Sequence, residues 1–240
     1  MGRIKRLKKM NNEDKSVKTF ASNEQLSEQL CQRVSAQLSD AIAARGHAYL
    51  VVSGGNTPKP LFEKLSQTDI DWKHVTIMLA DERWVLPDSN DSNDKLIKTV
   101  LLKNKAAKAH YISLYTGHEK AQNAAPVLSE QLNELPEFDV IILGMGDDGH
   151  TASLFPDCAE LQQGLTANDA VIATQPTKAP YARVSLTKSR IMNSRNIYLH
   201  FCGENKLQVF KQVEDSGKAI LPIGEFLHQQ QVPTEVYYAA

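Results

Sequence analysis

The sequence predicts an α/β protein in which helices cover both faces of a largely parallel sheet. Near-continuous apolar runs, typical of buried strands, alternate along the chain with helical patterns. A chain of 240 residues can bury most of its apolar surface without disulfides or metals. No internal repeat and no linker divides the sequence, so we expect a single domain over residues 16–240.

The first helix is expected between Ser22 and Gly46. Residues 22–25 (SNEQ) match a capping box, with a hydroxyl at the N-cap and an amide three residues later. Apolar residues then recur every fourth position, as on one face of a helix: Leu26, Leu30, Val34, Leu38 and Ile42. Gly46 is a typical helix end.

Strands and helices alternate through the middle of the sequence. Apolar runs over 48–52 and 75–79 indicate buried strands. A helix is expected after each of them, over 59–67 and over 93–103. A weaker strand pattern follows at 111–114.

The same alternation continues to the carboxyl terminus. A helix is expected over 119–135, where Pro126 indicates a kink or a break. The third strong strand covers 138–143. Strands are then expected at 171–174, 183–187 and 196–201. A helix over 205–213, a short helix after Pro222 and a closing strand at 235–238 complete the pattern.

The charge distribution argues against general nucleic-acid binding. The chain has 27 Lys and Arg against 28 Asp and Glu, and residues 1–15 contain six of these cations and two of the acids. The other 225 residues hold 21 cations and 26 acids, a net charge of −5. Residues 1–15 are predicted to be a disordered basic tail. The alternative, a basic arm on nucleic acid or an acidic membrane, lacks interleaved aromatic residues.

Hydropathy and cysteine content favour a cytoplasmic protein. No run of about 18 apolar residues is present, so neither a membrane span nor a membrane partner is expected. The cysteines are odd in number and far apart: Cys31, Cys158 and Cys202. They match neither a disulfide framework nor a metal-ligand spacing, which fits a reducing compartment.

The first strong strand leads into residues 53–58 (SGGNTP). Gly54 and Gly55 permit positive φ and a close approach of the backbone to a ligand. Thr57 fits an N-cap and Pro58 the first helical position. Free N–H groups at a helix N-terminus bind anions such as phosphate. An ordinary strand–turn–helix corner is the alternative, and the lysine of a P-loop is absent.

Three charged residues follow the second strong strand directly. Arg83 offers a bidentate contact to phosphate or to an oxyanion. Asp81 can accept a proton or orient a histidine. A solvated loop in which Asp81, Glu82 and Arg83 form an internal ion pair is the alternative.

The third strong strand leads into residues 144–153 (GMGDDGHTAS), which contain a GxGxxG pattern. A dinucleotide site is disfavoured, because the two aspartates would repel a pyrophosphate and no acid ends the following strand. The glycines instead form a tight loop that presents Asp148 and His150. A carboxylate near an imidazole can hold its tautomer and favour general-base catalysis. Ser153 lacks the Gly-x-Ser-x-Gly context of a nucleophile.

For two later cations, the sequence allows a structural role as well as a role in the site. Arg183 and Lys206 lie at element boundaries, where each is either a surface charge or within reach of the phosphate loop. His200 lies in a predicted strand and is interpreted as a core or edge histidine. No histidine pair has the spacing of a zinc site.

Together these motifs resemble the 6-phosphogluconolactonase family, which is related to the glucosamine-6-phosphate deaminases. The matching segments run in the family's order from about Val17 to the carboxyl terminus: 53–58, 81–85, 91–93, 144–156, 183–187 and 203–206. The run at 149–156 is the most specific. The family's proline after the second motif is displaced here by Leu86, and Asp-Ser-Asn occurs twice, of which 91–93 is the copy we align.

The resemblance implies a modified doubly wound α/β fold and hydrolysis of 6-phospho-D-glucono-1,5-lactone in the oxidative pentose phosphate pathway. It implies no metal and no organic cofactor. The implied catalytic residues are His150, which activates water, Asp148, which supports it, and Asp81. Arg83 and Asp81 would line the sugar site. The other implied substrate-binding residues are Ser53, Gly54, Gly55, Asn56, Thr57, Arg183 and Lys206.

The implied partner is the phosphorylated sugar lactone alone, bound by a monomer or a homodimer without nucleic acid or membrane. Two rival functions are weighed. The deaminases continue after Gly-His with an Asn-Glu-Pro type segment, whereas residues 151–155 here read TASLF. A non-catalytic sugar-phosphate sensor would normally append a DNA-binding helix pair, and only a short basic segment precedes Val17.

Overall fold

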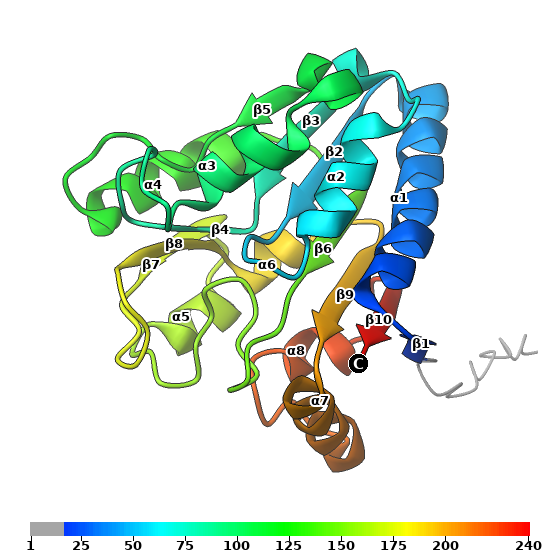
Figure 1. Ribbon diagram of the computed structural model, residues 1–240. Helices are drawn as coiled ribbons and strands as arrows, with labels where there is room; N and C mark the ends of the chain where they lie inside the picture. Colours follow the sequence, from blue (N-terminus) through cyan, green and yellow to red (C-terminus); the bar gives the residue numbers. More distant parts are fainter. Residues whose placement is uncertain (1–16) are drawn as a thin grey trace, which may run out of the picture.

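A parallel sheet forms the centre of the computed structural model, which describes residues 17–240 (Figure 1). The predicted basic tail, 1–15, lies outside these residues. Within the described part of the chain the sheet has seven strands, and every neighbouring pair is parallel. In spatial order they are β1 (Val17–Phe20), β10 (Thr234–Ala239), β9 (Ile197–Cys202), β6 (Val140–Leu143), β2 (Ala48–Val52), β3 (Val75–Leu79) and β5 (His110–Ile112). The predicted fold class is confirmed.

The direction of winding reverses beside β2. From β2 the chain continues to β3 and β5 on one side, then crosses to β6 on the other side and on to β9 and β10. In open parallel sheets such a reversal leaves a crevice at the carboxyl ends of the two central strands. The loops that follow β2 and β6 are thereby brought to the same place.

Helix α1 (Asn23–Arg45) forms as predicted. The Ser22 hydroxyl accepts a hydrogen bond from the Gln25 N–H at 3.2 Å, and Gly46 ends the helix at φ 77°. Leu26, Leu30, Val34 and Leu38 are fully buried, and complete burial of a leucine stabilises the fold by about 1.5–3 kcal/mol. In Figure 1, α1 lies beside α2 (Lys59–Gln67), with which it is in contact.

The other helices differ from the expectations mainly in their limits. The helix expected over 93–103 is α-helical only at α3 (Asn93–Leu96) and continues as a π-helical turn (Ile97–Leu101). Helix α4 continues through Pro126 without a break, although a proline at this position removes the hydrogen bond that an N–H would donate to the Gln122 carbonyl. The remaining helices are α4 (Ala121–Asn133), α5 (Leu161–Thr166), α6 (Lys188–Met192), α7 (Glu204–Ser216) and α8 (Gly224–Leu227), with 3-10 turns at Trp72–His74 and Asn104–Lys108.

A second, antiparallel sheet stands to one side of the parallel one, at the left of Figure 1. It consists of β4 (Asp81–Arg83), β8 (Arg183–Leu186) and β7 (Val171–Thr174). Two expectations are therefore corrected. Residues 171–174 and 183–187 do not extend the parallel sheet, and the charged segment after the second strong strand, for which a solvated loop was the alternative, is itself a strand. Pairing of Asp81 with Ser185 and of Arg83 with Arg183 makes it a strand despite its polarity.

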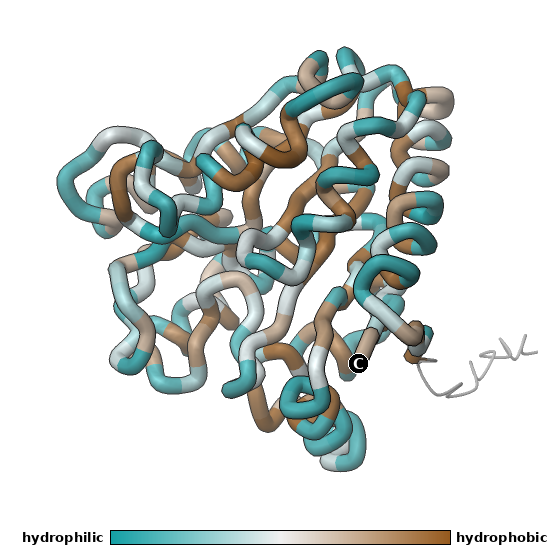
Figure 2. The backbone as a smooth tube through the Cα atoms, in the orientation of Figure 1, coloured by the Kyte–Doolittle hydropathy of each residue, from teal (hydrophilic) through white to brown (hydrophobic). Residues whose placement is uncertain are grey.

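The apolar core follows the strands of the parallel sheet. Figure 2 shows hydrophobic segments inside the molecule and hydrophilic turns on the outer side of α1. Trp72, Phe62 and Phe138 are among the largest fully buried side chains. No helix within residues 17–240 has the length and apolar character needed to cross a membrane.

Candidate active site

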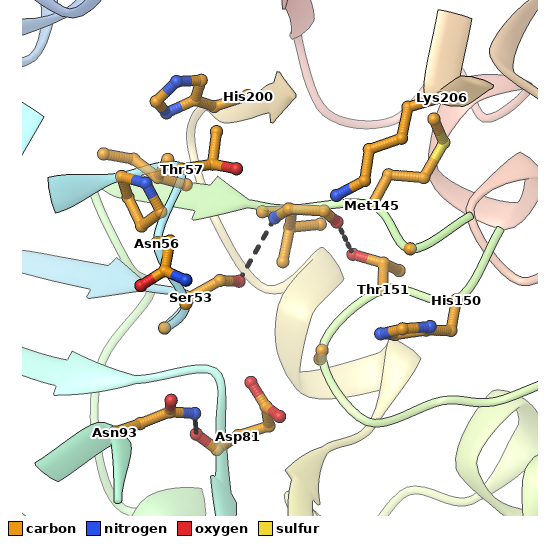
Figure 3. Close-up of a pocket in the computed structure, with 18 of the residues that line it drawn as sticks. Ser53, Asn56, Thr57, Asp81, Asn93, Met145, His150, Thr151, His200 and Lys206 are labelled. Carbon is orange, nitrogen blue, oxygen red and sulfur yellow. Dashed lines mark hydrogen bonds between the residues drawn. The ribbon is translucent and has the colours of Figure 1, made fainter. Parts of the chain in front are cut away.

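A pocket of about 240 Å³ opens at the carboxyl ends of β2 and β6 (Figure 3). Asp148 does not line the pocket but pairs with His150, which does. The other ten residues predicted for the site all line the pocket: Ser53, Gly54, Gly55, Asn56, Thr57, Asp81, Arg83, His150, Arg183 and Lys206. The residues that the sequence predicted for the site therefore gather around one pocket.

The loop after β2 presents unpaired backbone N–H groups to the pocket. Gly55 has φ 95°, and a Cβ on Gly54 would lie 2.0 Å from the Asn93 side-chain oxygen. Ser53 anchors the loop, since its hydroxyl accepts a hydrogen bond from the Gly144 N–H at 3.3 Å. Within the described chain, the N–H groups of residues 54–57 donate to no protein acceptor. This arrangement suits an anion.

The helix predicted over 59–67 forms with these limits, but its N-cap is Pro58 and not the expected Thr57. Helix α2 begins at Lys59 with Pro58 at the N-cap, and Thr57 makes no capping hydrogen bond. Two prolines, Pro58 and Pro60, occupy the first turn, where missing N–H groups are not needed. The loop of residues 54–57, the candidate anion-binding loop, therefore precedes the helix as a separate turn.

His150 has one ring nitrogen engaged and one available. Its Nδ1 lies 2.6 Å from Asp148 Oδ1, which also accepts a hydrogen bond from the His150 backbone N–H at 3.1 Å. Burial raises the pKa of Asp148, but these hydrogen bonds and the nearby imidazole lower it by a larger amount. The pKa of Asp148 therefore lies below its usual range. The ionised carboxylate holds the proton on Nδ1, and Nε2 remains free as an acceptor.

The position of the His150 ring is also restricted by Phe155 and Gly146. Phe155 stacks on it at 4.0 Å between ring centroids and 27° between planes. A Cβ on Gly146 would lie 2.2 Å from the ring and 2.7 Å from Asp148 Oδ1. Glycine is required at 146 because the imidazole occupies the space of a side chain.

Asp81 and Glu82 are adjacent in sequence but have different surroundings. Asp81 lines the pocket and accepts a hydrogen bond from the Ser153 hydroxyl at 2.5 Å. Glu82 is buried outside the lining and accepts backbone N–H groups of Arg83, Asn93 and Asp94 at 2.7, 2.8 and 2.6 Å. Burial raises the pKa of Glu82 and these bonds oppose the rise. Glu82 stabilises the start of α3.

The charged lining of the pocket is mainly cationic. Arg83, Arg183 and Lys206 face a single lining carboxylate, Asp81. Arg83 is braced by the Asp91 carbonyl at 2.8 Å, and Arg183 by the Pro180 carbonyl at 3.1 Å. Burial lowers the pKa of Arg183 while the charge of Asp81 opposes the change, and an arginine starts high enough to stay charged at neutral pH. The pocket therefore favours an anionic ligand.

Several lining residues were not predicted as site residues. Asn93 donates to the Asp81 carbonyl at 3.1 Å and lies against the glycine loop; its place in the repeated Asp-Ser-Asn was the available signal. His200 is buried as expected, at 3% exposure, yet also lines the pocket. Its position near the carboxyl end of a central strand was the signal. No group of three His, Cys, Asp or Glu side chains within 17–240 is arranged to hold a metal.

The fold and the pocket together define the class of α/β proteins that bind a small anionic ligand at the switch point of a parallel sheet. A family model described as glucosamine-6-phosphate isomerases/6-phosphogluconolactonase matches residues 21–235. A 6-phosphogluconolactonase of Rhizobium meliloti (strain 1021) is 41% identical over 224 residues, covering 92% of this chain and 97% of the relative. Another, from Pseudomonas putida, is 38% identical over 225 residues, 92% of each chain.

Solved structures agree with these sequence relatives. A 6-phosphogluconolactonase from Shewanella baltica OS155 superposes with a TM-score of 0.93 at 44% identity, covering 95% of this chain and 99% of that one. The chain belongs to the family of glucosamine-6-phosphate isomerases and 6-phosphogluconolactonases. Within it, the chain is an enzyme of the 6-phosphogluconolactonase group, which confirms the resemblance found in the sequence.

Proposed function

We propose that the chain hydrolyses 6-phospho-D-glucono-1,5-lactone to 6-phospho-D-gluconate, a step of the oxidative pentose phosphate pathway, by water that His150 activates. The observation that carries this mechanism is the position of His150. Its Nδ1 is held by Asp148, and its imidazole lines the same pocket as the unpaired loop N–H groups and three cations. The names of the relatives support the substrate.

The phosphate group of the substrate is assigned to the loop of residues 54–57. The free N–H groups of this loop donate to its oxygens, while Lys206 and Arg183 supply positive charge. Binding at this remote end orients the lactone carbonyl near His150, so binding energy is used to position the reacting atoms.

Hydrolysis then needs one proton carrier. His150 Nε2 removes a proton from water as the water oxygen bonds to C1 of the lactone, and the carbonyl oxygen becomes an oxyanion. When the bond from C1 to the ring oxygen breaks, the imidazolium returns the proton to that oxygen. The new carboxylic acid ionises and releases one proton. Either loop N–H groups or Arg83 stabilise the oxyanion.

Asp148 and Asp81 have distinct proposed roles. Asp148 keeps the proton on Nδ1 and stabilises the imidazolium that forms during the reaction. Asp81, fixed by Ser153, lines the sugar part of the pocket together with Arg83. Its carboxylate accepts hydrogen bonds from the sugar hydroxyls and balances the charge of Arg183.

The test is a coupled assay with freshly prepared 6-phosphogluconolactone, corrected for spontaneous ring opening. The His150→Ala variant is expected to lose at least about tenfold and up to about 10⁴-fold in kcat, because a positioned base is removed. His74→Ala is the matched control, since His74 also pairs through Nδ1 with an aspartate, at 2.8 Å, but outside the pocket. Near-normal turnover by a folded His150→Ala variant would remove His150 from the mechanism.

A second assay separates the rival reaction. Incubation with glucosamine 6-phosphate, followed by measurement of ammonia, tests deaminase activity. A monomeric glucosamine-6-phosphate deaminase shares the fold with a TM-score of 0.76 at 16% identity, which is a likeness of fold alone. Ammonia release without acceleration of lactone opening would overturn the proposed function.

A further inference from the structure

Hydrogen bonds connect β9 to the anion-binding loop through the first residue of α1. His200 Nε2 lies 3.0 Å from Asn23 Oδ1, and Asn23 Nδ2 donates to the Thr57 carbonyl at 2.8 Å. Three segments that are far apart in sequence therefore meet behind the loop. The reaction described above uses neither Asn23 nor His200.

The direction of each hydrogen bond follows from the chemistry of the partners. A carbonyl oxygen only accepts, so Asn23 presents its NH₂ to Thr57 and its oxygen to His200. His200 must then donate through Nε2, which leaves Nδ1 without a proton. Burial, with the charge of Lys206, lowers the pKa of His200 to about 4, so the ring is neutral at neutral pH.

Stability alone does not account for a histidine at position 200. The side chain is 3% exposed, and its Nδ1 is buried without a hydrogen-bond partner among residues 17–240. An unpaired buried acceptor destabilises a fold relative to an apolar side chain of similar size. The advantage of a histidine at position 200 must therefore come from its other nitrogen, Nε2, which fixes the orientation of the Asn23 amide.

We propose that Asn23 and His200 are positioning residues that hold the Thr57 carbonyl away from the bound phosphate. The inference rests on the proposed function, which assigns phosphate to this loop. Asn23 does not line the pocket, so its amide draws the carbonyl oxygen out of the anion's surroundings. The Thr57 carbonyl, engaged by Asn23, is then kept from the phosphate, to which the N–H groups of residues 54–57 donate. Figure 3 shows His200 and Thr57 on the same side of the pocket, across from Asp81.

The experiment compares phosphate-dependent binding in four variants of the full chain. Calorimetric titration with 6-phosphogluconate, inorganic phosphate and unphosphorylated gluconate is applied to His200→Leu, Asn23→Ala, the double variant and His200→Gln. Glutamine keeps an N–H donor near the position of imidazole Nε2. His47→Leu is the control, because His47 also makes one side-chain hydrogen bond, to Thr76 at 2.8 Å, and lies outside the pocket. Thermal melting reports folding of each variant.

His200→Leu and Asn23→Ala are each expected to weaken 6-phosphogluconate binding about three- to tenfold, the effect of one hydrogen bond. The same increase is expected in KM for the lactone, with kcat within about twofold. The double variant should bind no more weakly than either single variant, because both act through one carbonyl. His200→Gln should bind within about twofold of the unaltered chain, and melting temperatures should change by less than about 4 °C.

Additive losses in the double variant, a loss in kcat without a change in KM, or an equal loss in His47→Leu would overturn the inference. Failure of the unaltered chain to open the lactone would instead overturn the proposed function. The two failures are distinguishable, because inorganic phosphate binding is measured without turnover.

Discussion

Replacing Gly146 by alanine tests the importance of the orientation of His150. The added Cβ would lie 2.2 Å from the imidazole, whereas ordinary contact begins near 3.4 Å. The ring therefore has to move by about 1.2 Å, the difference between these distances. Phe155 packs against the ring and opposes a simple retreat.

A displacement of about 1 Å of a catalytic group lowers the rate about 10²-fold. We therefore expect kcat for 6-phosphogluconolactone to fall about 100-fold in Gly146→Ala. KM should change little, because the atoms nearest to the new methyl group belong to His150 and Asp148 and not to the loop of residues 54–57 or to Lys206. The coupled assay, corrected for spontaneous opening, measures both constants.

Gly164→Ala is the matched control for overpacking. Its Cβ would meet Leu154 at 2.5 Å and Ile172 at 2.7 Å, away from the pocket. It should lose stability to a similar extent, about 1–3 kcal/mol, and retain kcat. Normal turnover in Gly146→Ala, or an equal loss of kcat in Gly164→Ala, would refute the argument that ring position controls the rate.

Two further predictions concern Lys206 and His200. Lys206→Ala should act mainly by raising KM for the phosphorylated lactone, because Lys206 lines the pocket and is the proposed partner of the phosphate. An unchanged KM in steady-state assays would contradict this assignment. The folded-state pKa of His200 is about 4, below the ordinary 6.5. Between these values the unfolded chain binds a proton that the folded chain does not, so the free energy of unfolding should fall as the pH falls, by on the order of 3 kcal/mol. Denaturation at pH 7 and pH 4.5 should show that His200→Gln loses less free energy of unfolding than the unaltered chain. Equal losses in the two proteins would count against the lowered pKa of His200.

Local sequence signals predicted the strong elements well. The apolar run of β2 and the cap and stripe of α1 depend on neighbouring residues, and both matched their predicted limits closely. β1 and β4 were missed because their pairing partners are remote. β1 pairs with β10 at the other end of the chain, and β4 with β8 about a hundred residues later. Neither segment has an apolar run of its own.

The candidate site was likewise predicted where neighbouring residues determine it and missed where remote segments do. Gly54, Asp81 and His150 follow strong strands, and the geometry of parallel sheets brings such positions to one edge. Glu82 illustrates the limit, because only the fold shows that this carboxylate accepts backbone N–H groups of α3 while its neighbour Asp81 lines the pocket. His200 could not be distinguished from a core histidine until Asn23 was placed beside it.

By itself, then, the sequence determined which segments form the central strands, which loops end them and which side chains those loops carry, because these properties depend on residues close together in the chain. The tertiary structure alone decided which ring nitrogen of His150 faces the pocket and which of two adjacent acids is buried. It also decided that Asn23 of α1 and His200 of β9 lie beside the loop of residues 54–57. These outcomes depend on contacts between segments whose separation along the chain carries no information about their separation in space.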